Sequence, residues 1–308
     1  MAIATEINNL KTNILNAYTS IQTKGGTIPT NKNTENLSSA IETITTGTGG
    51  GDFSEYFTTP LKVGDTYTSG FNNSLQKIPE GLILPADSSY FFSYCRNLKN
   101  VSALNTMTIP TSINISRMFQ FSGITSIPDN IFTPTNLQET FYSCSSLTTL
   151  PQMNTSNCTT MSGFCRGCSK VTSFPTYNTS KVQLVTNMCN GCIALTTIPL
   201  LDWHLVRQLS SAFLNCTALT TLGGFQNLGQ TYSTTASANA SSLTLVLTSS
   251  NNLTEQSLIN VLTNLYDIAT NGVKTQTVQL GATNLAKLTS EEGQAALTQA
   301  QNFGWSIS

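Results

Sequence analysis

A short motif recurs along the middle of the chain, between residues 90 and 223. It places an aromatic residue or Cys, then Cys, then Leu or Val, then Leu, Phe or Ile at intervals of three, and most copies end on Pro. The clearest copies begin at Phe141, Cys165, Cys189 and Phe213, and two divergent copies begin at Phe92 and Met118. A further apolar position lies seven residues before the cysteine of each clear copy, at Leu137, Met161, Val185 and Leu209.

The spacing of the copies predicts a solenoid. The cysteine position falls at residues 95, 121, 144, 168, 192 and 216, with Phe121 in the second copy, so the steps are 26, 23, 24, 24 and 24 residues. A fixed period of roughly 20 to 50 residues is typical of stacked repeats, because one such unit is too small to bury its own apolar face. We therefore expect the apolar positions to face inward and to form ladders along the stack.

Pairs of Thr or Ser separate the last two apolar positions, for example Thr172 with Ser173 and Thr196 with Thr197. Because Thr is β-branched, these pairs favour short β-segments, and the Pro that follows ends each segment. We expect the segments of successive copies to form one continuous sheet, whose outward side chains are Thr and Ser.

The segments "NTSNCTTMSGFCRGCSKVTSFPTYNTSKVQLVTNMCNGCIALTTIP" and "LSSAFLNCTALTTL" resemble BspA-like leucine-rich repeats. The resemblance covers roughly half of the chain and implies an α/β, β-rich leucine-rich-repeat solenoid. Such repeats are common in bacterial surface proteins, and they carry many different binding partners.

Both flanks of the repeats are expected to be separate modules. Residues 1–50 predict a helical module, with Ile7, Leu10 and Ile14 at heptad spacing, for attachment or oligomerisation. The alternative is an amphipathic helix that packs on a second helix near residues 34–45. The segment "EINNLKTNILNAYTSIQTKGGTIPTNKNTENLSSAIETI" resembles the N-terminal module of phage tail and minor structural proteins, which implies attachment to a particle.

The remaining boundaries follow from composition and periodicity. Residues 51–89 predict a β-rich lead-in, 90–228 the repeats, and 229–308 an α/β C-terminal cap, with a long loop over 223–239. Within the cap we expect strands at 242–248, 277–280 and 305–307, and helices at 255–270 and 289–302, as a β-α-β-α-β unit that continues the sheet of the repeats.

Composition excludes several classes of function. Charged residues make up 9% of the chain and the net charge is −1, so we expect no nucleic-acid partner and no polybasic membrane patch. No window approaches 18 apolar residues, which argues against membrane insertion, and the first residues do not read as a secretory signal.

The eight cysteines allow three interpretations. Cys165-x-x-Cys168 followed by Cys189-x-x-Cys192 has the spacing of a zinc ribbon, and Cys165 with Cys189 could form a disulfide across neighbouring coils. The favoured interpretation is a set of reduced core residues without metal, because other copies place Phe or an unpaired Cys at the same positions.

Few side chains suggest a site. The single histidine, His204, has no recognisable nucleophile motif beside it, and the carboxylates are scattered, so we expect neither catalysis nor a cofactor. Tyr177 and Trp203, with His204, are the candidates for aromatic stacking on a sugar, although a core position is the default for an aromatic stripe. Thr172 and Thr196 are the candidates on the hydroxyl-rich face.

These observations together predict a non-enzymatic virion protein. We expect a component of a bacteriophage tail, baseplate or fibre, with a repeat surface that binds a host glycan or protein for host attachment. Its N-terminal module would contact other virion proteins or form a homo-oligomer, with a trimer favoured by analogy with fibres. The alternative is a BspA-like adhesin on a bacterial cell surface; a polysaccharide-cleaving spike enzyme is the least favoured.

Overall fold

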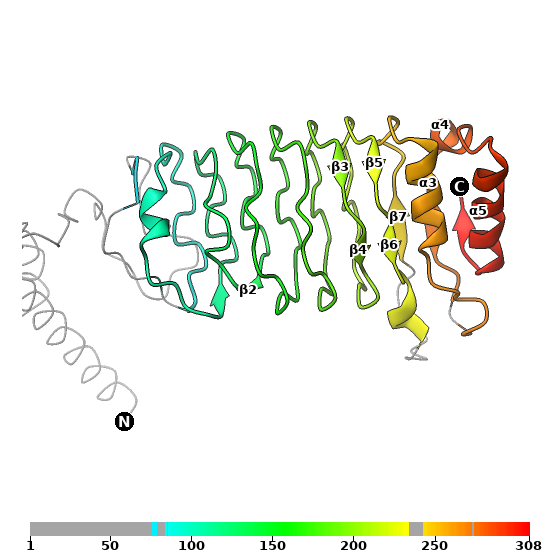
Figure 1. Ribbon diagram of the computed structural model, residues 1–308, viewed down its shortest axis with the longest axis horizontal. Coiled ribbons are helices and arrows are strands. Elements are labelled where there is room, and N and C mark those ends of the chain that lie inside the picture. Colours follow the sequence, from blue (N-terminus) through cyan, green and yellow to red (C-terminus); the bar gives the residue numbers. More distant parts are fainter. Residues whose placement is uncertain (1–74, 79–83, 85, 234–242, 273) are drawn as a thin grey trace, which may run out of the picture.

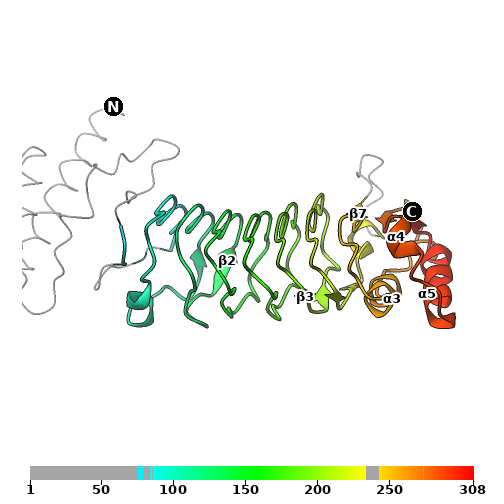
Figure 2. The same cartoon turned by 90° about the horizontal axis from the view of Figure 1, so that it is seen from above.

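The computed structural model describes residues 75–78, 84, 86–233, 243–272 and 274–308. Between residues 75 and 233 the chain winds into a row of similar coils that lie side by side along the longest axis, and the helices α3 and α5 lie at the C-terminal end (Figure 1; Figure 2). We call this row the coil stack. The predicted N-terminal module, with Ile7, Leu10 and Ile14, and most of the predicted lead-in lie outside the described residues.

One edge of the coil stack is built from turns, and we call it the turn edge. It comprises one eight-residue segment from each of six coils: 88–95, 115–122, 137–144, 161–168, 185–192 and 209–216. In each of the first five segments, alternate backbone N–H groups donate to carbonyl groups of the next coil. The four bonds between coils 3 and 4 join Leu137 to Thr160, Glu139 to Ser162, Phe141 to Phe164 and Ser143 to Arg166, at 2.7–3.0 Å. Each coil therefore supplies the backbone partners that its neighbour lacks.

The intervening N–H groups of the turn edge bond within their own coil. Cys144 N–H donates to Phe141 O at 3.0 Å, and Cys168 N–H donates to Cys165 O at the same distance. Such consecutive tight turns require left-handed backbone at two positions of each segment, with φ between 53° and 79°. The second of these positions holds Tyr94, Phe121, Ser143, Gly167, Gly191 and Asn215.

The apolar positions of the motif are buried, as the periodicity predicts. Cys144, Leu147 and Leu150 are buried in coil 3, and the matching residues of coils 4 to 6 are buried as well. The rings of Phe92, Phe119 and Phe141 stack across coils 1 to 3, with centroids 5.5 Å and 5.9 Å apart. Where Cys165 replaces the ring in coil 4, Phe164, Phe174 and Tyr177 pack edge to face. Removal of these apolar surfaces from water stabilises the stack.

The structure corrects the alignment of the second copy. Ser122, rather than Phe121, occupies the cysteine position, since its Oγ lies 3.5 Å from the Sγ of Cys144. Phe119, rather than Met118, fills the aromatic position between Phe92 and Phe141. Coil 2 is one residue shorter at Gly123 than the other coils, which shifts its motif by one position. Glycine fits there because a Cβ would lie 2.0 Å from the carbonyl oxygen of Arg96.

Regular strands in the coils are shorter than the expected continuous sheet. The parallel pairs are β1 (Ile113–Asn114) with β2 (Pro134–Asn136), β3 (Thr197–Ile198) with β5 (Thr221–Leu222), and β4 (Leu201–Asp202) with β6 (Phe225–Gln226). Single bridges such as Ser173 to Thr197 extend these pairs. The predicted loop over 223–239 is wrong at its start, because Phe225 continues the buried ladder of Leu201 and β6 pairs with β4. Two 3-10 helices, η2 (Ser102–Asn105) and η3 (Gln230–Ser233), complete the coils.

The C-terminal region follows the predicted order of elements, with one addition. It consists of β7 (Thr244–Val246), α3 (Glu255–Thr263), β8 (Thr277–Gln279), α4 (Ala282–Leu285), α5 (Glu291–Asn302) and β9 (Ser306–Ile307). The strands form a parallel sheet in the order β7-β8-β9. This sheet is separate from the strands of the coils, so the expectation that it continues them is wrong. Helix α3 is shorter than predicted and takes that place instead.

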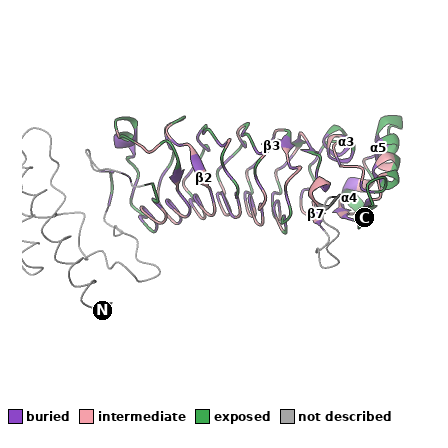
Figure 3. Cartoon of the chain, turned by 90° about the horizontal axis from the view of Figure 1, so that it is seen from below, coloured by how far each residue is buried: buried purple, intermediate pink, exposed green. Residues whose placement is uncertain are grey.

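Helix α3 closes the last coil through polar side chains. Thr254 N–H donates to Thr220 O at 3.0 Å, which brings the start of the helix to the position of a further coil. The Oγ of Ser257 accepts from Leu222 N–H, and the amide of Asn260 donates to Leu222 O. Outside α3 lies α5, whose outer surface is exposed (Figure 3). Atypical polar end units of this kind are what a stack needs at an open end.

The cysteine position has a polar function inside the core. The thiols of Cys144, Cys168, Cys192 and Cys216 each donate to a carbonyl of the preceding coil, at 2.9–3.2 Å; the acceptors are Phe119, Phe141, Cys165 and Cys189. Those carbonyls also accept a turn N–H from their own coil. A thiol thus combines apolar volume with one weak donor at a position that needs both.

Substitution of Cys168 tests this role. We expect Cys168→Ala to lower the free energy of unfolding by about 1–3 kcal/mol, because it removes buried volume and the S–H donor. Cys168→Ser should cost less than the alanine variant, because a hydroxyl can donate to Phe141 O and coil 2 already carries Ser122 at this position. Urea unfolding of both variants measures the difference. A serine variant no more stable than the alanine variant would contradict the role of the donor.

Candidate functional site: the exposed edges of the coil stack

The two aromatic residues predicted to stack on a partner are buried, so that prediction is wrong. Trp203 has no exposed surface, and its ring packs against those of Phe225, with centroids 4.2 Å apart, and Phe213, at 5.8 Å. Tyr177 is 5% exposed, and its hydroxyl donates to the carbonyl of Pro151 in the preceding coil at 2.5 Å. Both rings are part of the buried core, so neither is available to a ligand.

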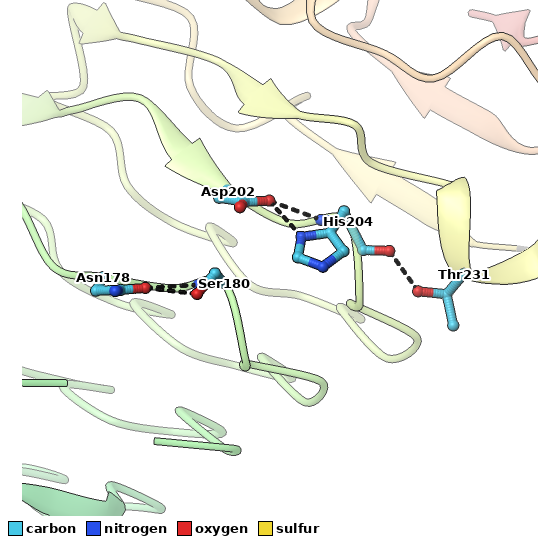
Figure 4. A network of polar contacts seen from close by, with 5 residues as sticks. All are labelled: Asn178, Ser180, Asp202, His204 and Thr231. Carbon is cyan, nitrogen blue, oxygen red and sulfur yellow. Dashed lines mark hydrogen bonds and ion pairs between the residues drawn. The ribbon is translucent and has the colours of Figure 1, made fainter. Parts of the chain in front are cut away.

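His204 belongs to a turn that other coils build without histidine. Its backbone N–H donates to Asp202 Oδ1 at 3.2 Å, and its Nδ1 lies 2.7 Å from the same oxygen (Figure 4). In the preceding coil Asn178 Oδ1 accepts from Ser180 N–H at 3.1 Å in the same arrangement (Figure 4). The carbonyl of His204 accepts from Thr231 Oγ1. Because Asn178 and Ser180 form the same turn in the preceding coil, the contact between Asp202 and His204 is explained by local capping of the backbone.

Thr172 and Thr196 lie where the sequence predicts them, on an exposed row that we call the threonine face: Thr148, Thr172, Thr196 and Thr220. The first three are exposed and Thr220 is half-buried. The hydroxyl of Thr196 donates to Thr172 O at 2.9 Å, and that of Thr220 donates to Thr196 O at 3.2 Å. Since the hydroxyl protons are directed to the preceding coil, the lone pairs on the oxygens remain for a partner that donates hydrogen bonds.

All eight cysteines are buried and reduced, which confirms the prediction that they are core residues. The Sγ of Cys165 lies 3.5 Å from that of Cys189 and 3.7 Å from that of Cys192, distances of thiol contact. Burial raises the pKa of the Cys95 and Cys144 thiols to about 12, which keeps them protonated and weakens them as nucleophiles. In the part of the chain that the structure describes, no group of three or more His, Cys, Asp and Glu side chains is arranged to hold a metal ion.

Sequence reasoning missed a row of side chains on the turn edge. Tyr94 stacks on Phe121 with ring centroids 4.7 Å apart, and Phe121 lies 4.8 Å from the ring of Tyr142. The guanidinium of Arg166 lies over Tyr142, 5.1 Å from its centroid. We call these four residues, one from each of coils 1 to 4, the aromatic row. The signal was a second aromatic residue beside the core Phe in "FFSYC", "FQFSG" and "FYSC", but assignment of Phe121 to the cysteine position concealed it.

A second polar group lies on the same edge. Arg117 Nε donates to Glu139 Oε2 at 2.6 Å, and Arg117 Nη1 donates to the hydroxyl of Tyr90, also at 2.6 Å. The Arg117 guanidinium also lies over the Tyr90 ring, 5.2 Å from its centroid. This group joins coils 1 to 3, and it neutralises Arg117 within the protein.

Substitution of Trp203 distinguishes core packing from a binding role. Its Nε1 is buried and has no hydrogen-bond partner among the described residues. Trp203→Phe removes this unpaired donor and keeps an aromatic ring against Phe225, so we expect a cost below about 1.5 kcal/mol. Trp203→Ala should cost about 3–5 kcal/mol, as large core truncations do. Urea unfolding measures both; an alanine variant as stable as the parent would contradict the packing.

Within the described residues, no helix is long and apolar enough to span a membrane. Comparison with known proteins gives no match to the chain among protein-family models, curated proteins or solved structures. The resemblance to BspA-like repeats therefore rests on the motif residues alone.

Proposed function

We propose that this protein is a non-enzymatic binding scaffold of a virion, in which a leucine-rich-repeat solenoid of the BspA-like type presents a surface to the host. The observation that carries the proposal is the threonine face: threonine hydroxyl groups repeat at the same position of consecutive coils, exposed at Thr148, Thr172 and Thr196 and half-buried at Thr220. A row of hydroxyl oxygens on consecutive coils suits a partner whose own groups repeat, such as a surface glycan or an arrayed surface protein.

The chemistry of the threonine face supports binding that is weak at each site and gains from repetition. The row carries no charge, so it contributes hydrogen bonds without electrostatic steering, and its affinity should depend little on salt. Each hydroxyl contributes little by itself, and several copies of the protein on one particle would raise the avidity. The N-terminal residues 1–50, with their heptad spacing, are the proposed means of trimer formation or attachment to other virion proteins.

A cell-binding assay with the fluorescently labelled full chain tests the proposal. We expect binding to intact cells of the host bacterium, and a loss of about tenfold or more when Thr172 and Thr196 are both changed to Lys. The matched control is Thr159→Lys, because Thr159 is an exposed threonine of a different row, in which Arg207 already provides a long basic side chain. Light scattering of the full chain should show a trimer.

The outcomes separate the candidate functions. Unchanged binding by the Thr172 and Thr196 double variant, in a protein with the parent's unfolding midpoint, would contradict the role of the threonine face. Antibody labelling of purified particles tests the virion assignment, and labelling of the bacterial cell surface in the absence of particles would favour the adhesin alternative.

A further inference from the structure

The aromatic row occupies positions where the fold does not require aromatic side chains. All six coils share the turn edge, yet the left-handed position of Tyr94 and Phe121 holds Ser143, Gly167, Gly191 and Asn215 in the other coils. The position of Tyr142 and Arg166 holds Asn190 and Leu214 in coils 5 and 6. The requirements of a stacked turn are therefore met without rings or a guanidinium.

Two of the rings occupy strained backbone. Tyr94 has φ of 62° and Phe121 has φ of 57°, in the left-handed region that Gly and Asn adopt at lower cost. Strained residues that persist without a structural need are often part of a functional surface. Tyr94 is also 42% exposed, and it is one of three large hydrophobic residues that are exposed among the described residues.

Charge on the turn edge is confined to the same four coils. Segments 88–95, 185–192 and 209–216 contain no charged residue, whereas coils 2, 3 and 4 place Arg117, Glu139 and Arg166 on this edge. Glu139 is paired with Arg117. The guanidinium of Arg166 lies over the face of Tyr142 and makes no hydrogen bond to any residue that the structure describes. Arg166 is half-buried, and its N–H donors can bind an anionic group outside the protein.

We propose that the aromatic row binds an acidic oligosaccharide, with a sugar ring against the exposed Tyr94 and a sugar carboxylate on Arg166. A planar guanidinium held over a ring presents a fork that matches a carboxylate in two parallel hydrogen bonds. Rings with a polar tip, such as Tyr94, suit the apolar faces and hydroxyl rims of sugars. The inference rests on the proposed function as a surface-binding protein and adds a second site, on the turn edge, with its ligand class.

The dimensions of the row favour a linear glycan over a protein partner. The row takes one side chain from each of coils 1 to 4 and runs along the stack, with successive spacings of 4.7, 4.8 and 5.1 Å. A stable protein–protein interface buries about 800 Å² on each partner, which needs a broad surface. A narrow line of rings that ends on a cation fits a chain of sugars lying along it.

The test measures binding of polygalacturonate oligosaccharides to the full chain by calorimetry. We expect binding that weakens as salt rises from about 10 to about 150 mM, because the interaction includes an ion pair. Neutral dextran should not bind, and dextran sulfate should bind more weakly than polygalacturonate. Equal binding of dextran sulfate would indicate a general polyanion surface and would overturn the proposal, as would equal binding of dextran.

Two variants test the site with residues that other coils already have at the same positions, so a loss of binding would not reflect a loss of folding. Tyr94→Asn places the residue that coil 6 uses, and Arg166→Asn places the residue that coil 5 uses, so both variants should keep the parent's unfolding midpoint. Each should weaken polygalacturonate binding about tenfold, as loss of a charge-assisted hydrogen bond or a ring contact does. Arg207→Gln, which removes an exposed arginine outside the turn edge, is the control and should leave binding unchanged.

The results also separate this inference from the proposed function. Full affinity in the Tyr94→Asn and Arg166→Asn variants would overturn the aromatic row as the site. A protein that binds host cells through the threonine face, with no affinity for polygalacturonate, would overturn the inference and leave the proposed function standing. Failure to bind either cells or polygalacturonate would contradict both.

Discussion

The structure depends on backbone hydrogen bonds that one coil cannot make by itself. On the turn edge, alternate N–H groups point along the stack, and only a neighbouring coil offers carbonyl groups at the matching positions. The pattern holds between all six coils, including those whose spacing departs from 24 residues. Because buried backbone groups must be paired, each coil is stable only as a member of a row. Where the row ends, Ser257 and Asn260 of α3 provide hydrogen-bond partners for the backbone of Leu222 in the last coil.

This constraint explains which residues the motif repeats. A turn that bonds along the stack at every second residue needs left-handed backbone twice in each coil, which admits Gly and Asn and makes bulky residues costly. The inward position three residues before Leu147 must fill volume and donate one hydrogen bond, which a thiol can do. Repetition of Cys in this structure therefore reflects packing and capping.

Much of the coil could be predicted from the sequence because burial follows the period. The inward positions, the reduced cysteines and the order of C-terminal elements follow from apolar spacing and capping residues such as Thr254. The candidate site was predicted poorly, since period alone does not say where a loop aromatic points. Trp203 and Tyr177 are buried among residues of neighbouring coils, such as Phe225 and the carbonyl of Pro151, which no pattern in one coil reveals. The missing residue near Gly123 shifted the second copy by one position, and that shift concealed the half-buried ring of Phe121 on the turn edge.

The central claim is that the coils are equivalent units held by the same inter-coil bonds, and removal of one whole unit tests it most directly. Deletion of residues 173–196 joins Thr172 to Thr197 and recreates the local sequence of the Thr196–Thr197 junction. Urea unfolding followed by circular dichroism should then show one cooperative transition, with a smaller dependence on denaturant because less surface is exposed on unfolding. Deletion of half a unit, residues 185–196, should abolish that transition, because the inward positions and turn amides lose their partners. Loss of the cooperative transition in the whole-unit deletion, or its retention in the half-unit deletion, would contradict the account.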